Sequence, residues 1–201
     1  MSNRLHTPDE DEKELVARLK KGKEEAYRIL VRRFQERLLS IAYGITQDRE
    51  DSADIVQDVF LQVFKRIDTF RGEAKLYTWL RRITVNQALN WQRRWKRRFK
   101  WHHQPIEKEE IYDKMNDRTP AENPETAYMA KEIDARLNEE LQRLPEDART
   151  VFILREQEGL AYDEIARLLN VKKGTVSSRL FYTRERLKNR MSLFLEKEES
   201  E

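Results

Sequence analysis

The sequence predicts an all-α protein made of two small helical domains, and three observations support this prediction. Charged residues make up 38% of the chain, which has only 5 glycines and 5 prolines, and this composition favours long amphipathic helices. Apolar side chains recur at helical spacing in two stretches, and the spacing fails between them. A chain of 201 residues suits one or two compact units rather than one large core. The predicted division is a domain at 1–100, a linker at 101–128 and a domain at 129–201.

The first domain is predicted to begin with a helical hairpin. Gly22 is the expected break between its two helices. A further apolar stripe starts at Asp48 and ends at a turn around Gly72, after which a third long helix follows. The apolar residues of the hairpin are Leu15, Leu19, Ala26, Ile29, Leu30, Phe34, Leu38, Ile41 and Ala42, and those of the stripe are Ile55, Val59, Phe60, Val63, Phe64 and Ile67. These patterns predict a helical bundle.

The third helix has an unusual composition. Residues 81–101 contain six arginines, two lysines and three tryptophans, but no carboxylate. On a helical wheel, cations, amides and one indole share a face that consists of Trp79, Arg82, Asn86, Asn90, Arg93 and Arg97. The opposite side, which is predicted to pack in the core, carries Leu76, Leu80, Ile83, Trp91, Trp95 and Phe99.

The polar face of this helix combines three kinds of group that bind nucleic acid. Arginine neutralises phosphate, asparagine pairs with base edges, and an exposed aromatic ring stacks on an unpaired base. The face therefore predicts binding of single-stranded or opened nucleic acid. One alternative is a merely solvated helix whose tryptophans lie in the core. Another is a helix that lies on an anionic membrane surface, although Asn86 and Asn90 offer lipid nothing in particular.

Residues 101–128 are predicted to form a flexible acidic linker. This range holds three of the five prolines and many acidic residues, and it has no sustained apolar periodicity. Helical periodicity returns from about Ala130 and continues almost to the end of the chain.

The C-terminal domain contains a predicted helix-turn-helix in "GLAYDEIARLLNVKKGTVSSRLFYTRERLKNRM". Its first helix has Ile165 and Ala166 inward, and its second opens near Thr175 with Val176 and Leu180 inward. The outward residues, which we expect to reach base edges in a minus-thirty-five DNA element, are Lys173, Thr175, Ser177, Ser178, Arg179, Phe181 and Tyr182. Helical packing without DNA binding is the alternative.

Several function classes are not expected. The chain has no cysteine, which excludes disulfides, thiolate zinc sites and cysteine nucleophiles. His6, His102 and His103 lie in the predicted tail and linker without a catalytic constellation, so neither an enzyme nor a cofactor or metal site is expected. No apolar run approaches the ~20 residues that span a bilayer, and the N-terminus is too polar for a signal peptide. A cytoplasmic protein without membrane insertion is predicted.

Nearly the whole chain resembles the extracytoplasmic-function (ECF, group 4) sigma factors of bacterial RNA polymerase. The resemblance rests on "EDSADIVQDVFLQVFKRIDTFRGEAKLYTWLRRITVNQALNWQRR", followed by the helix-turn-helix. It implies that region 2 binds the β′ clamp helices of core RNA polymerase through a D-x-x-Q-D/E motif, here Asp54, Gln57 and Asp58. These three residues also share one helix face, where the alternative role is ordinary solvation or pairing with Lys65 or Arg66.

The same resemblance implies how promoter DNA is bound. The basic helix would hold the melted minus-ten element, and the loop "FRGEAKLY" would capture an extruded base, with Tyr77 and Trp79 as alternative stacking partners. Region 4 would read the minus-thirty-five element as duplex DNA and dock on the β flap. The implied minus-ten residues are Arg71, Tyr77, Trp79, Arg82, Asn86, Asn90, Arg93 and Arg97. Members of the family usually have an anti-sigma factor, so such a partner is expected, and a stress- or envelope-responsive regulon is implied.

The chain departs from the family in its recognition helix. Members often read "GTVRSRLxRAR", whereas Ser177 replaces the first arginine here and Tyr182 and Thr183 replace the last "RA". Because a bidentate arginine–guanine pair is worth about 1–3 kcal/mol, we expect an upstream promoter sequence that differs from the common one. For the linker, threading through the RNA exit path and an inert spacer are both open. The alternative function is a polymerase-independent helix-turn-helix regulator that binds duplex operator DNA as a symmetrical dimer.

Overall fold

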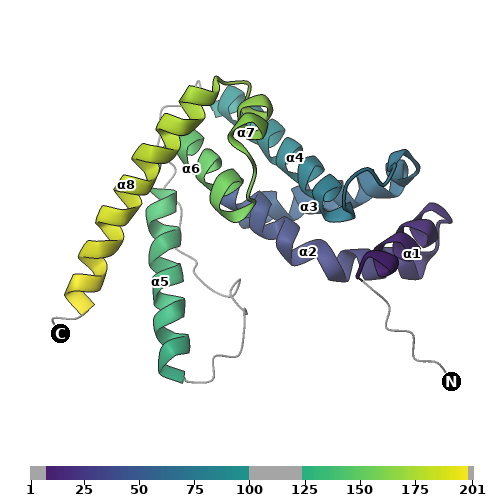
Figure 1. The fold of residues 1–201 in the computed structure, drawn as a ribbon, viewed down its shortest axis with the longest axis horizontal. Helices are drawn as coiled ribbons and strands as arrows, with labels where there is room; N and C mark the ends of the chain where they lie inside the picture. The colour runs from purple at the N-terminus through teal and green to yellow at the C-terminus, as the bar shows by residue number, and fades with distance from the viewer. Residues whose placement is uncertain (1–7, 100–123, 199–201) are drawn as a thin grey trace. The chain divides into compact units, whose positions relative to one another are not determined.

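The computed structural model describes residues 8–99 and 124–198, and all the regular structure in these ranges is helical (Figure 1). The chain divides into two compact units, Met1–Phe99 and Lys100–Glu201. The predicted all-α class is confirmed. Residues 101–123, which make up most of the predicted linker, lie outside the described residues.

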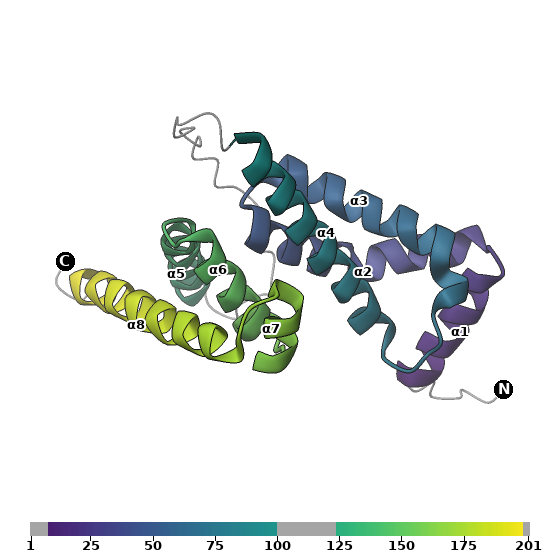
Figure 2. The same cartoon turned by 90° about the horizontal axis from the view of Figure 1, so that it is seen from above.

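The first unit is a bundle of four helices and a short 3-10 turn (Figure 2). The elements are α1 (Pro8–Lys20), α2 (Glu24–Thr46), α3 (Arg49–Arg66), η1 (Ile67–Thr69) and α4 (Leu76–Phe99). Helices α2, α3 and α4 pack against one another, and α1 packs on α2 and η1. The fully buried side chains at the centre include Leu30, Leu38 and Ile41 of α2 and Leu76 and Leu80 of α4.

Local sequence explains where these helices begin and end. Gly22 has a φ of 68° between α1 and α2, which is the left-handed conformation that glycine adopts at least cost. Asp48 caps α3, as its side chain accepts a 3.0 Å hydrogen bond from the backbone amide of Asp51. The predicted break at Gly22 and the predicted start at Asp48 are confirmed.

The buried stripe of α4 is only partly the predicted one. Leu76 and Leu80 are buried as expected, and the stripe continues through Thr84, Val85, Ala88, Leu89 and Gln92. Ile83 and Trp91 are half-buried, while Trp95 is 40% exposed, so the prediction of a core Trp95 is wrong. Ala88 and the buried residues around it occupy the inward positions in the second half of the helix. The indole of Trp95 is therefore left at the edge of the core. The side chain of Phe99 lies outside the described residues.

The second unit is organised around the long C-terminal helix. Its elements are α5 (Pro124–Gln142), α6 (Glu146–Phe152), the π-helical turn η2 (Ile153–Gln157), α7 (Tyr162–Leu169) and α8 (Lys173–Glu198). Helix α8 packs against α5, α6 and α7, and Leu141, Leu144, Ile153 and Leu187 form a buried cluster between them. Helix α5 begins at Pro124, inside the range that the sequence predicts as linker, because proline fits the first turn of a helix.

Residues at both ends of α7 define the first helix of the helix-turn-helix. Asn170 takes a left-handed conformation at the end of α7, and the amide of Val171 donates to the carbonyl of Ala166. At the start of α7, Ala161 occupies the N-cap position and offers no side-chain oxygen to the helix. The Glu164 carboxylate accepts a 2.9 Å hydrogen bond from the Ala161 amide, which is one half of a capping box.

Completing this cap should stabilise the second unit. Ala161→Ser supplies the missing acceptor, worth on the order of 1 kcal/mol. We expect the melting temperature to rise by about 4–8 °C, with unchanged DNA specificity because Ala161 is not on α8. Calorimetry of the parent and the variant measures this, with Glu164→Ala as a control that should lower the melting temperature. An unchanged or lower value for Ala161→Ser would refute the cap.

Candidate nucleic-acid interface

The basic face of α4 lies in solvent. Five of the six residues that the wheel predicts for this face are exposed, and the sixth, Trp79, is half-buried; the exposed residues are Arg82, Asn86, Asn90, Arg93 and Arg97. Their exposure follows from the burial of Val85, Ala88 and Leu89 on the other side of the helix.

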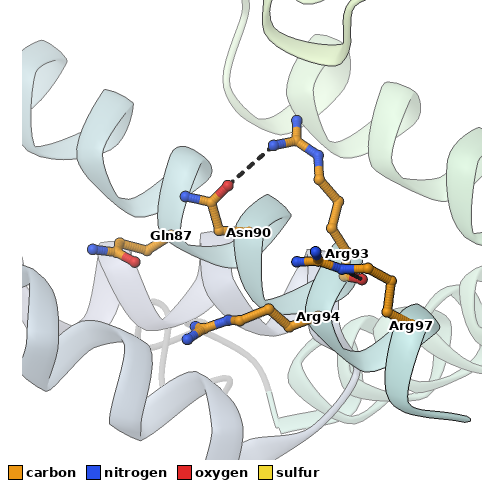
Figure 3. Close-up of a pocket in the computed structure, with 5 residues that line it drawn as sticks. All are labelled: Gln87, Asn90, Arg93, Arg94 and Arg97. Atoms are coloured by element: carbon orange, nitrogen blue, oxygen red, sulfur yellow. Dashed lines mark hydrogen bonds between the residues drawn. The ribbon is translucent and has the colours of Figure 1, made fainter.

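The second half of this face forms a hollow of about 390 Å³ (Figure 3). Arg93 donates a 3.0 Å hydrogen bond to the side-chain oxygen of Asn90, and the Arg97 side chain donates to the Arg93 carbonyl at 3.4 Å. The lining residues are Gln87, Asn90, Arg93, Arg94 and Arg97, with no carboxylate among them. A surface that offers cations and amides, without acidic groups to neutralise them, is suited to phosphate and base edges. Gln87 and Arg94 were not among the residues predicted for this face.

The two aromatic candidates near the start of α4 differ in their surroundings. The ring of Tyr77 stacks on Phe34 at 6.2 Å between centroids, and the guanidinium of Arg37 lies 3.7 Å from its centroid. Trp79 is also half-buried, but its ring has a tilted contact with Phe70 at 5.3 Å. Tyr77 is thus held by two neighbours, and a base that stacks on it would have to compete with Arg37.

The loop before α4 presents its polar residues to solvent. Residues 71–75 are all exposed, and Gly72 has a φ of 76°. Arg71, a predicted minus-ten residue, is 83% exposed and lies 4.0 Å from the Glu73 carboxylate. An exposed pair of this kind contributes little to stability, so the Arg71 guanidinium is accessible to a phosphate.

The predicted polymerase-binding residues lie together on α3. Asp54, Gln57 and Asp58 are exposed on one face of the helix. Within the part of the chain that the structure describes, neither carboxylate forms an ion pair, so the alternative pairing with Lys65 or Arg66 is not seen.

An apolar groove of about 540 Å³ runs between α2 and α3 beside these polar residues. Leu61 and Phe64 on its wall are 50% and 60% exposed, and the Phe64 ring contacts that of Tyr27 at 5.0 Å. The prediction of a core Phe64 is therefore wrong. The groove is lined mainly by Tyr27, Val31, Leu39, Val56, Gln57, Phe60, Leu61 and Phe64. The sequence could have indicated this exposed groove, because α3 has more apolar residues than one buried stripe requires.

A partly buried hydrogen bond joins the beginning of α3 to the basic helix. The Trp91 indole nitrogen donates a 2.9 Å hydrogen bond to the Asp51 carboxylate. Burial raises the pKa of Asp51, and repulsion from Asp48 and Asp54 raises it further, while the hydrogen bond from Trp91 acts in the opposite direction.

The helix-turn-helix exposes some of its predicted DNA-binding residues and pairs others. Ser177, Ser178, Phe181 and Tyr182 are exposed on α8, and the rings of Phe181 and Tyr182 meet edge to face at 5.5 Å. Arg179 is instead paired with Asp147 of α6 at 2.9 Å.

The remaining predicted positions lie at the start of α8. Lys173 is exposed and pairs with Asp163 at 2.9 Å, and Thr175 is half-buried, with its carbonyl accepting from the Ser178 hydroxyl. The freely presented surface is therefore aromatic and hydroxylic rather than cationic.

Comparison with known proteins identifies the family. The family model of Sigma-70 region 2 matches residues 30–98, and that of Sigma-70, region 4 matches residues 134–187. The chain is 35% identical to the RNA polymerase sigma-H factor of Pseudomonas aeruginosa, over 88% of this chain and 91% of that protein. It is 34% identical to the ECF RNA polymerase sigma-E factor of Escherichia coli K12, over 88% of this chain and 92% of that protein. The chain belongs to the extracytoplasmic-function sigma factors.

Solved structures agree with this family at the level of the fold. The sigma factor RpoE of Bartonella quintana, solved with the anti-sigma factor NepR, matches with a TM-score of 0.59 at 20% identity, over 83% of this chain and 96% of that one. CnrH, solved with the cytosolic domain of CnrY, matches with a TM-score of 0.54 at 21% identity, over 90% of this chain and 97% of that one. As a sigma factor, the protein directs RNA polymerase to promoters and initiates transcription there.

None of the helices in the described ranges has the length and apolarity to cross a membrane. In the same part of the chain, no group of three or more acidic or histidine side chains could hold a metal ion.

The Asp51–Trp91 contact predicts a pH dependence. Because the folded protein holds the Asp51 proton more tightly than the unfolded chain does, ionisation of this group favours unfolding. Relative to Asp51→Asn, whose amide oxygen still accepts from Trp91, the parent's free energy of unfolding should fall as the pH rises from about 3 to 7.

Urea unfolding of both proteins at a series of pH values measures this difference. Trp91→Phe should steepen the fall, because it removes the hydrogen bond that stabilises the charged carboxylate. A parent whose free energy of unfolding stays level or rises with pH relative to that of Asp51→Asn would contradict the assignment.

Proposed function

We propose that promoter recognition uses three surfaces, of which two lie on the first unit and one lies on the second. The face Asp54, Gln57 and Asp58, with the groove beside it, binds the β′ clamp helices of core polymerase. The exposed face of α4 holds the melted minus-ten element, and the outer side of α8 reads the minus-thirty-five element while the same unit docks on the β flap. The first two surfaces lie in the proposed domain 1–100 and the third lies in the proposed domain 129–201. The linker 101–128 joins these domains.

The observation that carries this proposal is the carboxylate-free hollow on α4. Its three arginines and two amides match an opened strand, which offers phosphates and unpaired base edges together. A regulator that binds only duplex DNA through its helix-turn-helix would not need this basic face on the other unit. The membrane-surface alternative is less suited, because Asn86 and Asn90 lie exposed in the middle of the face.

The surroundings of the aromatic residues support different roles for them. We assign stacking on an extruded base to Trp79, since Tyr77 is already occupied by Phe34 and Arg37. Stacking can return about 1–3 kcal/mol per base against the few kcal/mol that flipping costs. Arg71, at the exposed loop, would neutralise a neighbouring phosphate.

The exposed groove supports binding of a helical partner. Leu61 and Phe64 provide apolar area at its wall, and Gln57 and Asp58 provide a polar rim, which is the composition of a protein interface. Since RpoE of Bartonella quintana, which shares this fold, was solved with an anti-sigma factor, we propose an anti-sigma factor as a further partner, and a stress- or envelope-responsive regulon. The protein acts in the cytoplasm as a non-enzymatic initiation factor.

On α8, the proposed reading of the upstream element relies on Phe181 and Tyr182. Aromatic rings contact thymine methyl groups in the major groove, whereas guanine is read best by arginine. Arg179 reaches DNA only if it leaves Asp147, and Lys173 only if it leaves Asp163. We propose that Thr175, Ser177 and Ser178 contact the backbone or base edges at the start of the helix.

Run-off transcription with purified core polymerase tests the function. The parent should start transcripts at specific promoters, which are found by sequencing the DNA that is bound with polymerase. Gln57→Ala combined with Asp58→Ala should weaken core binding at least tenfold, because it removes one partner of a charged contact and its neighbour, and should abolish initiation. Glu36→Ala, an exposed carboxylate on α2 outside the groove lining, serves as the control.

Two results would contradict this assignment. Core binding by the double variant at the parental level would refute the role of the α3 face. A parent that gives no promoter-specific transcript, but binds duplex DNA as a symmetrical dimer, would establish the polymerase-independent regulator instead.

Asn86→Ala tests the α4 face separately. Loss of one amide that pairs with a base costs about 1–3 kcal/mol, so promoter opening should fall roughly ten- to hundredfold while core binding stays unchanged. Permanganate reactivity of promoter thymines measures opening, and a pull-down measures core binding. Gln142→Ala on α5 is the matched amide control. Normal opening by Asn86→Ala would remove this residue from the interface.

A further inference from the structure

Helix α1 holds both ends of the exposed loop at residues 71–75. The Lys20 ammonium donates a 2.8 Å hydrogen bond to the carbonyl of Phe70, directly before the loop. The Glu12 carboxylate accepts a 2.7 Å hydrogen bond from the amide of Leu76, directly after it. These contacts join residues that are 50 and 64 positions apart in the sequence. Figure 2 shows α1 beside the segment that connects α3 to α4.

The contact at Leu76 completes a helix that lacks its own cap. Helix α4 begins at Leu76 after Lys75, whose side chain has no hydrogen-bond acceptor, and its first turn contains no acidic residue. The first amides of a helix have no partner within the helix, and the helix dipole favours a negative charge there. Glu12 supplies both the acceptor and the charge from another helix, whereas α3 has its own cap in Asp48.

The contact at Phe70 secures the other end. The Phe70 side chain is only 6% exposed, its ring packs against Trp79, and its amide donates to the carbonyl of Ile67 at 3.0 Å. Lys20 therefore binds the carbonyl of a residue that is already held by its side chain and its amide. Between Phe70 and Leu76 every residue is exposed, so the loop has fixed ends and a free middle.

Helix α1 packs on the bundle through two buried leucines and one hydrogen bond near its end. Leu15 and Leu19 are buried at 5% and 0% exposure, and the Tyr27 hydroxyl donates to the Leu19 carbonyl. A helix that only covered the core would need these residues and no more. Glu12 and Lys20 instead direct their charged groups to the backbone at the two ends of one loop.

We propose that α1 is a positioning element for the promoter-reading loop, with Glu12 and Lys20 as its positioning residues. Neither side chain touches DNA in this proposal. By holding Leu76 and Phe70, they keep the loop in the arrangement that receives an unpaired base, so that less conformational entropy is lost when the strand binds. The inference rests on the proposed role of the loop in holding the melted minus-ten element.

Hydrogen exchange in the full-length protein tests the contacts without DNA. In Glu12→Ala and Lys20→Ala, the amides of Phe70 and Leu76, which are hydrogen-bonded at the two ends of the loop, should exchange about tenfold faster, the factor expected from loss of one charge-assisted hydrogen bond. Glu12→Gln, whose amide oxygen can still accept, should give an intermediate rate. Lys13→Ala on the exposed side of α1 and Glu36→Ala on α2 are matched controls that should leave the loop unchanged.

Binding measurements then connect the loop to DNA. We expect Glu12→Ala and Lys20→Ala, assembled with core polymerase, to bind promoter DNA with a pre-opened minus-ten element about tenfold more weakly. Core binding in a pull-down should stay within about twofold of the parent, since the α3 face is untouched.

Four results would overturn the inference. Parental exchange rates at Phe70 and Leu76 in both alanine variants would show that the contacts do not hold the loop. Equal acceleration across α2 and α3 would make α1 an ordinary structural helix. A faster loop with parental affinity for the opened promoter would remove the positioning role. A parent that fails to bind opened promoter with core would instead refute the proposed function, and with it the DNA part of this inference.

Discussion

The first unit depends on how the basic helix α4 is held by carboxylates that it does not contain. No residue between Leu76 and Phe99 is acidic, so like charges repel along this helix and its first amides have no acceptor of their own. Glu12 of α1 binds the amide at its start, and Asp51 of α3 binds the indole of Trp91 in its second half. Both carboxylates come from neighbouring helices and bind groups other than the exposed arginines. Within the described residues, no carboxylate pairs with the arginines of the outer face, where Arg93 contacts Asn90 and Arg97 contacts the Arg93 carbonyl.

Exposed apolar surface gives α3 a corresponding role toward protein. Val56, Val59 and Val63 are buried and hold α3 in the bundle, while Leu61 and Phe64 stay largely in water beside Gln57 and Asp58. Because these side chains are 50% and 60% exposed, burying the rest of each against a partner would add roughly half of the about 1.5–3 kcal/mol that full burial provides. The bundle thus exposes a basic surface on α4, which we propose binds nucleic acid, and an apolar surface beside acidic residues on α3, which we propose binds protein.

Periodicity in the sequence predicted the helices but not their rotation against one another. The all-α class, the break at Gly22, the cap at Asp48 and the helix-turn-helix were all accessible, because each depends on residues close in the chain. Trp95 and Phe64 were placed wrongly in the core, since a wheel shows which side is more apolar but not where a neighbouring helix stops covering it. The contacts of Glu12 with Leu76, Lys20 with Phe70 and Arg179 with Asp147 join residues 64, 50 and 32 positions apart, and no local pattern indicates such pairs.

The most direct test of this division of surfaces is site-specific photocrosslinking in the initiation complex formed with core polymerase. A photoreactive amino acid at position 90 is expected to label the melted strand within the minus-ten element, and only when core polymerase is present. The same group at position 64 is expected to label the β′ subunit and no DNA. Labelling of the β′ subunit alone from position 90, or of duplex DNA upstream of the melted region, would contradict the assignment of the α4 face.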